Sequence, residues 1–205
     1  MSKKIAGIDE AGRGALAGPV VAGTVIFHED SEDLQNLIKE LKDSKQLSSQ
    51  RRSILYAEII RICDVGVGII SAQRIDEIGI RKANQEAMQQ AIDQLRNTPT
   101  EILVDGRDGY FFTDKKTKNK QIPSTDIIKG DQKISEISAA SILAKVTRDE
   151  IMDHYDQQYT VFEFRNNKGY GSALHLKLIE NQQYTPIHRK SYDPLKTLLT
   201  QMSLF

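Results

Sequence analysis

The segment that most constrains the fold of this chain is its first apolar run, which ends in two adjacent carboxylates. The run reads KKIAGIDEAGRG, so Asp9 and Glu10 close the apolar stretch and are followed directly by Gly-Arg-Gly. Two like charges beside a buried strand cost free energy unless a positive charge or water compensates them. Three compensations are open at this point: the nearby Arg13, a bound metal ion, or exposure of both carboxylates in a turn.

Strands come first along the chain and then alternate with helices. Runs rich in β-branched residues predict the strands, and apolar residues at i, i+3 and i+4 predict the helices. The expected strands are 4–9, 19–27, 64–71, 101–106 and 125–129, and the expected helices are 31–42, 49–62, 80–95, 133–158, 172–182 and a last one begun by Asp193-Pro194. This order predicts an α/β fold with a mixed sheet.

The totals agree with one globular domain. The 205 residues are 39% hydrophobic and 27% charged, which is enough apolar sequence for a proper core. Lys+Arg and Asp+Glu both number 28, and this zero net charge argues against a generic polyanion-binding protein while leaving room for local basic patches. Cys63 is the only cysteine, and neither a signal peptide nor an apolar run of membrane length is present, so a cytoplasmic protein is expected.

Four acidic residues stand where expected strands end or where the long helix begins. Ligand sites in such sheets lie at the carboxyl ends of strands, and Asp9 and Asp105 each end an apolar run. If their strands are neighbours, both carboxylates converge, and Glu10 and Asp131 lie near them. Each acid also has a purely structural interpretation, namely a salt bridge of Asp9 and Glu10 with Arg13, a turn at Asp105, and an N-cap at Asp131.

Clustered carboxylates without histidine or cysteine ligands suit a hard cation such as Mg²⁺ or Mn²⁺. Two such ions about 4 Å apart clamp the attacking and leaving oxygens of a phosphodiester. The histidines at 28, 154, 175 and 188 have no zinc-ligand spacing, and the sequence has no nucleophile elbow. Metal-assisted phosphodiester hydrolysis is therefore the favoured chemistry.

Several longer motifs carry a family resemblance that covers residues 5 to about 195. In order they are GIDEAGRGALAGPVVA, DSKQLS, ILVDG, IKGD, EISAASILAKVTRD, NKGYGS followed by His175, and HRKSY. The chain resembles bacterial ribonuclease HII, of the type 2 ribonuclease H family. Two departures are Ser172, where threonine is frequent, and Tyr192, where phenylalanine is common.

This resemblance implies an RNase H-like mixed sheet flanked by helices, with a C-terminal helical extension. It implies hydrolysis of the RNA strand of RNA–DNA hybrids and incision on the 5′ side of single ribonucleotides in duplex DNA, leaving 3′-hydroxyl and 5′-phosphate ends. Its catalytic, metal-binding acids fall on Asp9, Glu10, Asp105 and Asp131, which would face Mg²⁺ or Mn²⁺ rather than Arg13. Residues 1–200 are then one catalytic domain, in which 151–200 is a helical substrate-positioning part, and residues 201–205 are a tail.

The resemblance also assigns residues to the substrate. Gly12, Arg13 and Gly14 match a motif that reads the ribose 2′-hydroxyl, where glycine allows close backbone approach. Tyr170 matches a tyrosine that stacks on the sugar after the ribonucleotide, although a packing aromatic is the plainer interpretation of the residue itself. Together these motifs would sense an RNA-to-DNA junction.

Further contacts with the nucleic-acid backbone are expected along the long helix. Its residues at spacings of 3, 4 and 3 share one face and suit phosphate tracking, although a solvated helix face looks much the same. These residues are Ser138, Ser141, Lys145 and Arg148, and the DSKQLS motif adds Ser44 and Lys45. His175 and His188 are interpreted as loop or packing residues without a catalytic role.

The chain ends in QMSLF, which looks like the pentapeptide with which bacterial repair proteins bind the DNA sliding clamp. Exposed apolar side chains need a receiving pocket, either in a partner or on the last helix of this chain. The candidate partner-binding residues are Gln201, Met202, Leu204 and Phe205. A monomer is expected. Two rival functions remain, a catalytically silent binder of RNA–DNA hybrids and another nuclease of the same fold.

Overall fold

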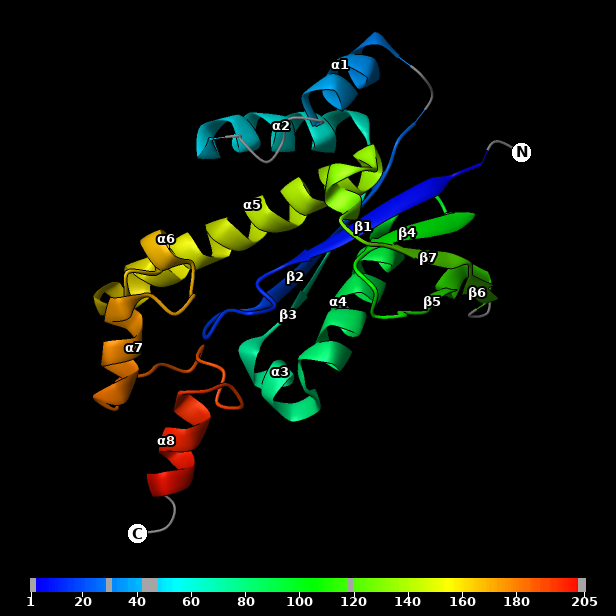
Figure 1. Cartoon of the computed structure of the whole chain (residues 1–205). Helices are drawn as coiled ribbons and strands as arrows, with labels where there is room; N and C mark the ends of the chain where they lie inside the picture. Colours follow the sequence, from blue (N-terminus) through cyan, green and yellow to red (C-terminus); the bar gives the residue numbers. More distant parts are fainter. Residues whose placement is uncertain (1–2, 29–30, 42–47, 118–119, 203–205) are drawn as a thin grey trace.

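The structure is a computed structural model that describes residues 3–28, 31–41, 48–117 and 120–202. Its centre is a five-stranded sheet in the order β3-β2-β1-β4-β7 (Figure 1). Strand β1 pairs antiparallel with β2 and parallel with β4, while β2–β3 is antiparallel and β4–β7 is parallel. The strands are β1 (Ile5–Ala11), β2 (Val20–Ile26), β3 (Asp64–Ile70), β4 (Glu101–Asp105) and β7 (Ser124–Ile127). The predicted mixed sheet is confirmed.

Helices cover both faces of this sheet. Figure 1 shows the long helix α5 (Ser135–Gln158) along one face, with α1 (Glu32–Leu41) and α2 (Ser49–Ile62) beyond it. Helix α4 (Ile80–Gln94) lies on the opposite face, preceded by α3 (Ala72–Ile78). One apolar core fills the space between the sheet and α4, and a second joins the other face to α1, α2 and α5.

Two glycines show how closely these helices lie on the strands. A Cβ on Gly7 of β1 would stand 2.2 Å from the carbonyl carbon of Glu136, in the first turn of α5. A Cβ on Gly68 of β3 would stand 1.8 Å from the carbonyl oxygen of Ala87 in α4. Backbone therefore packs on backbone, which holds the start of α5 against the middle of β1.

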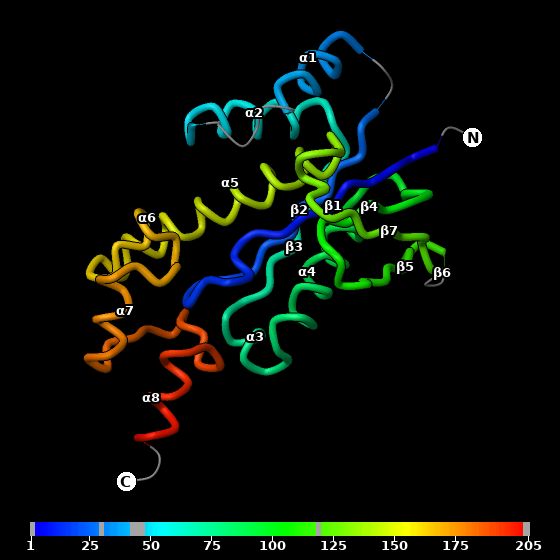
Figure 2. Tube along the Cα trace, in the orientation of Figure 1, coloured from blue at the N-terminus to red at the C-terminus, as the bar shows by residue number. Residues whose placement is uncertain are grey.

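The C-terminal segment returns toward the sheet after α5. It contains the turn η4 (Thr160–Phe162) and the helices α6 (Phe164–Asn167), α7 (Ala173–Glu180) and α8 (Leu195–Met202). The tube in Figure 2 passes through α6 and α7 and then beside the blue loop that follows β1. A third apolar cluster holds this segment to that loop and to α5, and it includes Ala17, Met152, Phe162, Phe164 and Ile187.

Short elements are the ones that sequence periodicity does not predict. They are α3, the strands β5 (Phe112–Asp114) and β6 (Lys120–Ile122), which form a two-stranded sheet, and the turn η2 (Lys115–Thr117). A seven-residue helix and three-residue strands carry too few residues to show a period. The last helix also starts one residue later than predicted, because the carbonyl of Pro194 accepts from the Leu198 amide and Asp193 instead accepts from the Thr197 hydroxyl.

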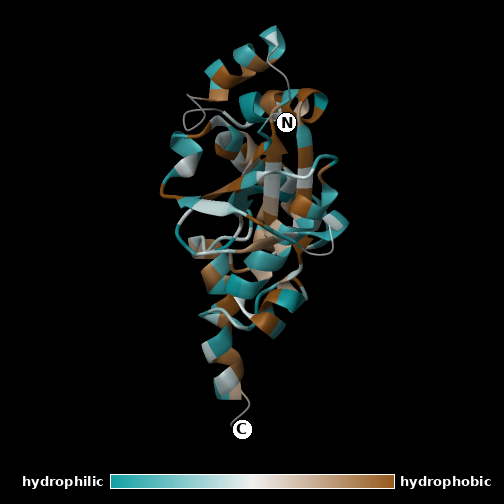
Figure 3. Ribbon diagram, turned by 90° about the vertical axis from the view of Figure 1, so that its right-hand side faces the viewer, coloured by the Kyte–Doolittle hydropathy of each residue, from teal (hydrophilic) through white to brown (hydrophobic). Residues whose placement is uncertain are grey.

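Hydropathy follows this layering. Figure 3 shows hydrophobic and hydrophilic residues alternating along the helices, as expected for helices with one face on a core. Helix α5 differs from the other helices because it is buried on more than one face. The sheet covers one side of its first four turns, and α1 and α2 cover the other. No helix within the described residues is both long enough and apolar enough to cross a membrane.

Candidate active site

The structure brings three carboxylates together at the carboxyl ends of β1 and β4. Ile8 pairs with Val104 in parallel register, so Asp9 and Asp105 come next on neighbouring strands. Repulsion from Asp105 raises the pKa of both Asp9 and Glu10, so the three carboxyl groups lie near one another at this edge of the sheet. We call Asp9, Glu10 and Asp105 the carboxylate cluster.

Asp9 points to the α5 face of the sheet and is only 7% exposed. Its Oδ1 accepts the Glu10 backbone N–H at 2.7 Å, and its carboxylate also bonds to the Ser141 side chain. Burial is the largest cause that raises the pKa of Asp9, and repulsion from Glu10 and then Asp105 raises it further. A charged Asp9 is therefore costly in the bare protein, and a cation at this position removes the cost.

Glu10 points to the opposite face, because successive residues of a strand alternate. Burial raises the pKa of its carboxyl, and the nearby Asn84 side chain of α4 acts in the opposite direction. Arg13 opposes this shift from a distance of 3.6 Å between its Nη1 and Glu10 Oε1. Arg13 itself pairs more closely with Asp108. That Glu10 faces a metal ion rather than Arg13 stays a prediction.

Asp131 lies in the turn η3 (Gly130–Gln132), beside the cluster but not in it. The Gly130 amide donates to Asp105 Oδ1 at 2.6 Å, which ties this turn to the end of β4. Asp131 does not cap α5, whose N-cap is Ile134. Among the described residues, no three acidic, histidine or cysteine side chains already form a closed metal-binding group. Mutual repulsion of carboxylates without a cation is a sufficient physical reason.

A loop with its carbonyl groups turned inward follows the cluster, and we call residues 12–18 the GRG loop. Arg189 donates to three of its carbonyls, those of Gly12 at 2.7 Å, Arg13 at 2.9 Å and Gly18 at 3.1 Å. The Tyr192 hydroxyl also donates to the carbonyl of Arg13. Since Arg189 is fully buried, these bonds fix the path of the loop from the protein interior.

Arg148 supports the same loop from α5. Its guanidinium donates to the carbonyls of Pro19 at 2.9 Å, Ala17 at 3.1 Å and Lys168 at 2.8 Å. Burial lowers its pKa to about 10, so it stays charged at neutral pH. Its Cζ lies 5.5 Å from the centre of the Tyr170 ring, which is 43% exposed. Tyr170 therefore presents its ring beside the GRG loop rather than packing inside.

The predicted phosphate-tracking row along α5 is wrong for two of its four residues, because these two are buried. Ser138 and Arg148 are buried, and the Ser138 hydroxyl donates to the last carbonyl of α1. Ser141 and Lys145 are partly exposed, Ser141 toward the carboxylate cluster and Lys145 in an ion pair with Asp149. The C-terminal segment and helices α1 and α2 cover the remainder of that face.

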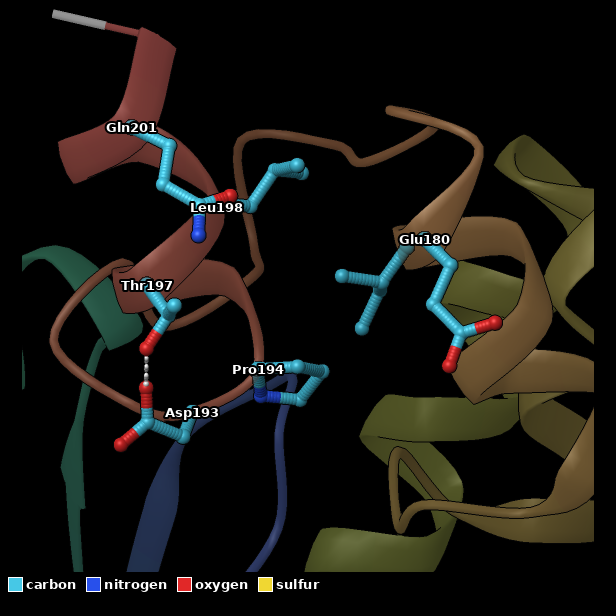
Figure 4. Close-up of a pocket in the computed structure, with 7 residues that line it drawn as sticks. Glu180, Asp193, Pro194, Thr197, Leu198 and Gln201 are labelled. Atoms are coloured by element: carbon cyan, nitrogen blue, oxygen red, sulfur yellow. Dashed lines mark hydrogen bonds between the residues drawn. The ribbon is translucent and has the colours of Figure 1, made fainter. Parts of the chain in front are cut away.

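The other predicted binding residues lie either at the end of a described range or outside the described residues. Gln201 and Met202 form the end of α8, whereas Ser44, Lys45, Leu204 and Phe205 lie outside the described residues. Gln201 lines a cavity of about 360 Å³ between α7 and α8, together with Pro194 and Leu198 (Figure 4). This cavity is separate from the carboxylate cluster.

Comparison with known proteins decides the family. A family model described as Ribonuclease HII matches residues 6–194. The chain belongs to the ribonuclease HII family. It is 44% identical over 196 residues to a Ribonuclease HII of Ligilactobacillus salivarius, covering 95% of this chain and 71% of that one. A Ribonuclease HII of Bacillus pumilus is 43% identical over 198 residues, with 96% and 72% covered.

Solved structures agree with this assignment. The ribonuclease H2 of Pyrococcus horikoshii superposes with a TM-score of 0.78 at 29% identity and covers 98% of this chain and 99% of its own. The ribonuclease HII in a PCNA complex from Archaeoglobus fulgidus gives 0.75 at 28% identity, with 93% and 95% covered. The chain is thus a metal-dependent hydrolytic endoribonuclease of the ribonuclease HII family.

Sequence analysis missed three side chains that shape this ribonuclease HII site. Asn84 is fully buried and bonds to Glu10, while Asp108 holds Arg13 and Arg189 holds the GRG loop. Asn84 is a polar residue on the apolar face of α4, which is the one signal that was visible in the sequence. The roles of Asp108 and Arg189 depend on contacts between distant segments.

Proposed function

We propose that this protein cleaves the RNA strand of RNA–DNA hybrids and incises on the 5′ side of single ribonucleotides in duplex DNA. The products carry 3′-hydroxyl and 5′-phosphate ends. The observation that carries the proposal is that the GRG loop follows directly after Asp9 and Glu10, and that Tyr170 lies beside the same loop. A cleaving site and a ribose-reading surface are thereby adjacent.

The donor set of the cluster fits divalent cations. Three acidic side chains lie near one another, the pKa values of Asp9 and Glu10 are raised, and oxygen ligands of this kind select Mg²⁺ or Mn²⁺. Asp9, Glu10, Asp105 and the neighbouring Asp131 would hold two ions. Ions bound there supply an activated water nucleophile and positive charge beside the leaving 3′ oxygen.

Groups of this chain orient the carboxylates before any ligand arrives. The Ser141 side chain bonds to Asp9, the Asn84 side chain to Glu10, and the Gly130 amide to Asp105. Such bonds hold the carboxylates in fixed positions, as supporting groups around metal ligands do. They leave other lone pairs of each carboxylate available to a cation.

Substrate selection is assigned to peptide groups and one aromatic ring. Gly12, Arg13 and Gly14 would read the ribose 2′-hydroxyl, which distinguishes RNA from DNA. A Cβ on Gly14 would meet nothing within 4 Å, so this side of the loop is open to a ligand. Tyr170 would stack on the following deoxyribose, and Ser141, Lys145, Ser44 and Lys45 would contact backbone phosphates.

The C-terminal segment is proposed to serve this reading surface and a partner. Residues 151–200 position the GRG loop and Tyr170, within a single catalytic domain that acts as a monomer. The tail Gln201–Phe205 would bind a DNA sliding clamp, a proposal supported by the PCNA complex of the Archaeoglobus fulgidus ribonuclease HII. This partner would bring the enzyme to DNA without changing its chemistry.

The deciding experiment uses a labelled DNA duplex that carries one ribonucleotide. Cleavage is measured with Mg²⁺, with Mn²⁺ and with EDTA, for the wild type and for Asp9→Asn. We expect a cut 5′ of the ribonucleotide that EDTA and the substitution both abolish. A folded wild type that binds this duplex without cutting it under either metal would favour the silent hybrid-binding protein. Cleavage of an all-DNA duplex or of single-stranded RNA would favour another nuclease of this fold.

A further inference from the structure

Two buried histidines connect the C-terminal segment to Tyr170 by hydrogen bonds. His175 Nδ1 lies 2.8 Å from the carbonyl oxygen of Tyr170, and His175 Nε2 lies 2.9 Å from His188 Nε2. His188 Nδ1 lies 3.0 Å from the backbone nitrogen of Thr185. The chain of contacts therefore runs from Thr185 through both rings to Tyr170.

The direction of every bond in this chain is fixed by its two ends. The Thr185 N–H can only donate, so His188 Nδ1 accepts and its proton sits on Nε2. That Nε2–H donates to His175 Nε2, which leaves the proton of His175 on Nδ1. The Tyr170 carbonyl can only accept, and His175 Nδ1–H is its donor. Both rings are neutral, each in one defined tautomer.

The surroundings favour this neutral state. His175 and His188 are 0% and 1% exposed, and their rings pack against Phe162 and Phe164. Burial lowers the pKa of both imidazoles, that of His188 to about 4. A proton added to either ring would remove an acceptor from the chain and break one of its bonds.

Both ends of the pair touch elements assigned to substrate reading. His188 forms a β-bridge with Ala17 of the GRG loop and precedes Arg189, which binds three carbonyls of that loop. At the other end, the bonded carbonyl belongs to Tyr170 itself. The Gly169 carbonyl beside it accepts the amides of Leu16 and Ala17.

We propose that His175 and His188 form a neutral imidazole relay that positions Tyr170 relative to the GRG loop. Both are positioning residues, since neither reaches the carboxylate cluster. The relay sets the spacing between the loop that reads the ribose and the ring that stacks on the next sugar. This inference rests on the proposed role of Tyr170 at the RNA-to-DNA junction.

The tautomers are tested on the unmodified protein by long-range ¹H–¹⁵N correlation spectra with ¹⁵N-labelled histidine. We expect His188 as the Nε2–H form and His175 as the Nδ1–H form at pH 7, with no change down to about pH 6. The opposite tautomer of either ring, or an imidazolium signal at pH 7, would overturn the relay.

The positioning role is tested by two substitutions that each keep half of the relay. In His175→Asn the amide nitrogen stands about where Nδ1 stood and still donates to Tyr170, whereas His175→Gln keeps a group near Nε2 and loses that donor. The readout is junction preference, defined as kcat/KM for the single-ribonucleotide duplex divided by kcat/KM for a continuous hybrid. Tyr170→Ala is the reference, and His154→Gln on exposed α5 surface is the control.

We expect His175→Gln to lower the junction preference by about tenfold, as Tyr170→Ala does, because one aromatic contact with a nucleotide contributes an effect of that order. His175→Asn keeps the donor to Tyr170 but loses the bond to His188, so its loss should be intermediate, whereas His154→Gln should stay within about twofold of the wild type. Equal preference in both His175 variants, with a clear loss in Tyr170→Ala, would overturn the relay alone. An unchanged preference in Tyr170→Ala would instead overturn the junction role of Tyr170 and the relay with it.

Discussion

Arg148 occupies the space that a side chain on Gly12 would need. A Cβ on Gly12 would lie 1.9 Å from Nε of Arg148, and Gly12 has a φ of +88°, which L side chains rarely adopt. The guanidinium has little freedom to move, because three carbonyl groups hold it. Glycine at this position thus allows a buried cation to support the GRG loop, which is a structural reason for the motif beside its proposed role toward ribose.

Gly12→Ala should therefore destabilise the protein by about 3 kcal/mol or more, since it adds backbone strain to a clash with a buried charged group. Gly14→Ala is the matched control, because a Cβ there meets nothing within 4 Å. Its unfolding free energy should stay within about 0.5 kcal/mol of the wild type, while cleavage at a single ribonucleotide falls. Urea unfolding compares the two variants, and equal stability would contradict the packing argument.

Asp9→Asn should stabilise the metal-free protein at neutral pH while abolishing cleavage. The folded pKa of Asp9 is raised, so its protonation stabilises the fold below the unfolded pKa, and this contribution is lost as the pH rises through the folded pKa. We expect the variant to have a higher free energy of unfolding than the wild type at pH 7 in EDTA, and the difference to vanish near pH 4. A variant less stable than the wild type at pH 7 would show that the carboxylates do not repel.

Divalent cations should raise the melting temperature of the wild type, and more at pH 8 than at pH 5. Ligand carboxylates must be deprotonated to bind a cation, and burial raises the pKa of Asp9 and of Glu10. At a hundredfold excess over Kd, bound Mn²⁺ adds about 2.7 kcal/mol to stability. Asp9→Asn should lose this response and Asp193→Asn should keep it. The same response in both variants would place the cation elsewhere.

Arg13→Gln should move the acidic limb of the pH–rate profile to higher pH. Arg13 lowers the pKa of Glu10, so its removal leaves that carboxyl protonated up to a higher pH. The kcat/KM profile on the single-ribonucleotide duplex reports the shift. Arg74→Gln, in an exposed cluster with Glu77 and Glu86, is the control. An acidic limb that does not move would remove Arg13 from the electrostatics of the site.

Deletion of residues 203–205 should abolish binding to a DNA sliding clamp while leaving cleavage of a free duplex nearly unchanged. Cleavage of a short free duplex should stay within about twofold of the full chain, since no residue of the tail is assigned to cleavage or to substrate reading. Binding to an immobilised sliding clamp should be lost, because apolar anchors carry most of such peptide contacts. Met202→Ala, with a side chain 47% exposed, should show a smaller loss. Undiminished clamp binding by the truncated chain would refute the role of the tail.

The sheet and the position of the acids follow from local sequence patterns. Alternation and β-branched runs predict the five central strands within about two residues, and Asp9 and Asp105 end two of them. Parallel pairing of β1 with β4 then brings both carboxylates to one edge, as expected for strands of this class. Asp131 shows the limit, because its place beside the cluster is set by the turn η3 rather than by any periodic pattern.

Arg148 shows why the other contacts around the site could not be predicted from the sequence. A charged residue at helical spacing with Ser141 and Lys145 is normally assigned to a solvated face. Its burial depends on backbone carbonyls of Ala17, Pro19 and Lys168, which come from segments far apart in the chain. The pairing of His175 with His188 likewise depends on tertiary contacts, which composition and spacing do not encode.

The bond between Arg189 and the Gly12 carbonyl spans 177 residues, and this has a consequence for how the molecule matures. During synthesis Asp9 and Glu10 emerge from the ribosome well before Arg189. Folding during synthesis proceeds from the N-terminus, so the sheet can form before the GRG loop has its support. The proposed discrimination of a ribonucleotide therefore waits until Arg189 has been synthesised, and a protease that removes the segment carrying Arg189 would remove the support of the GRG loop.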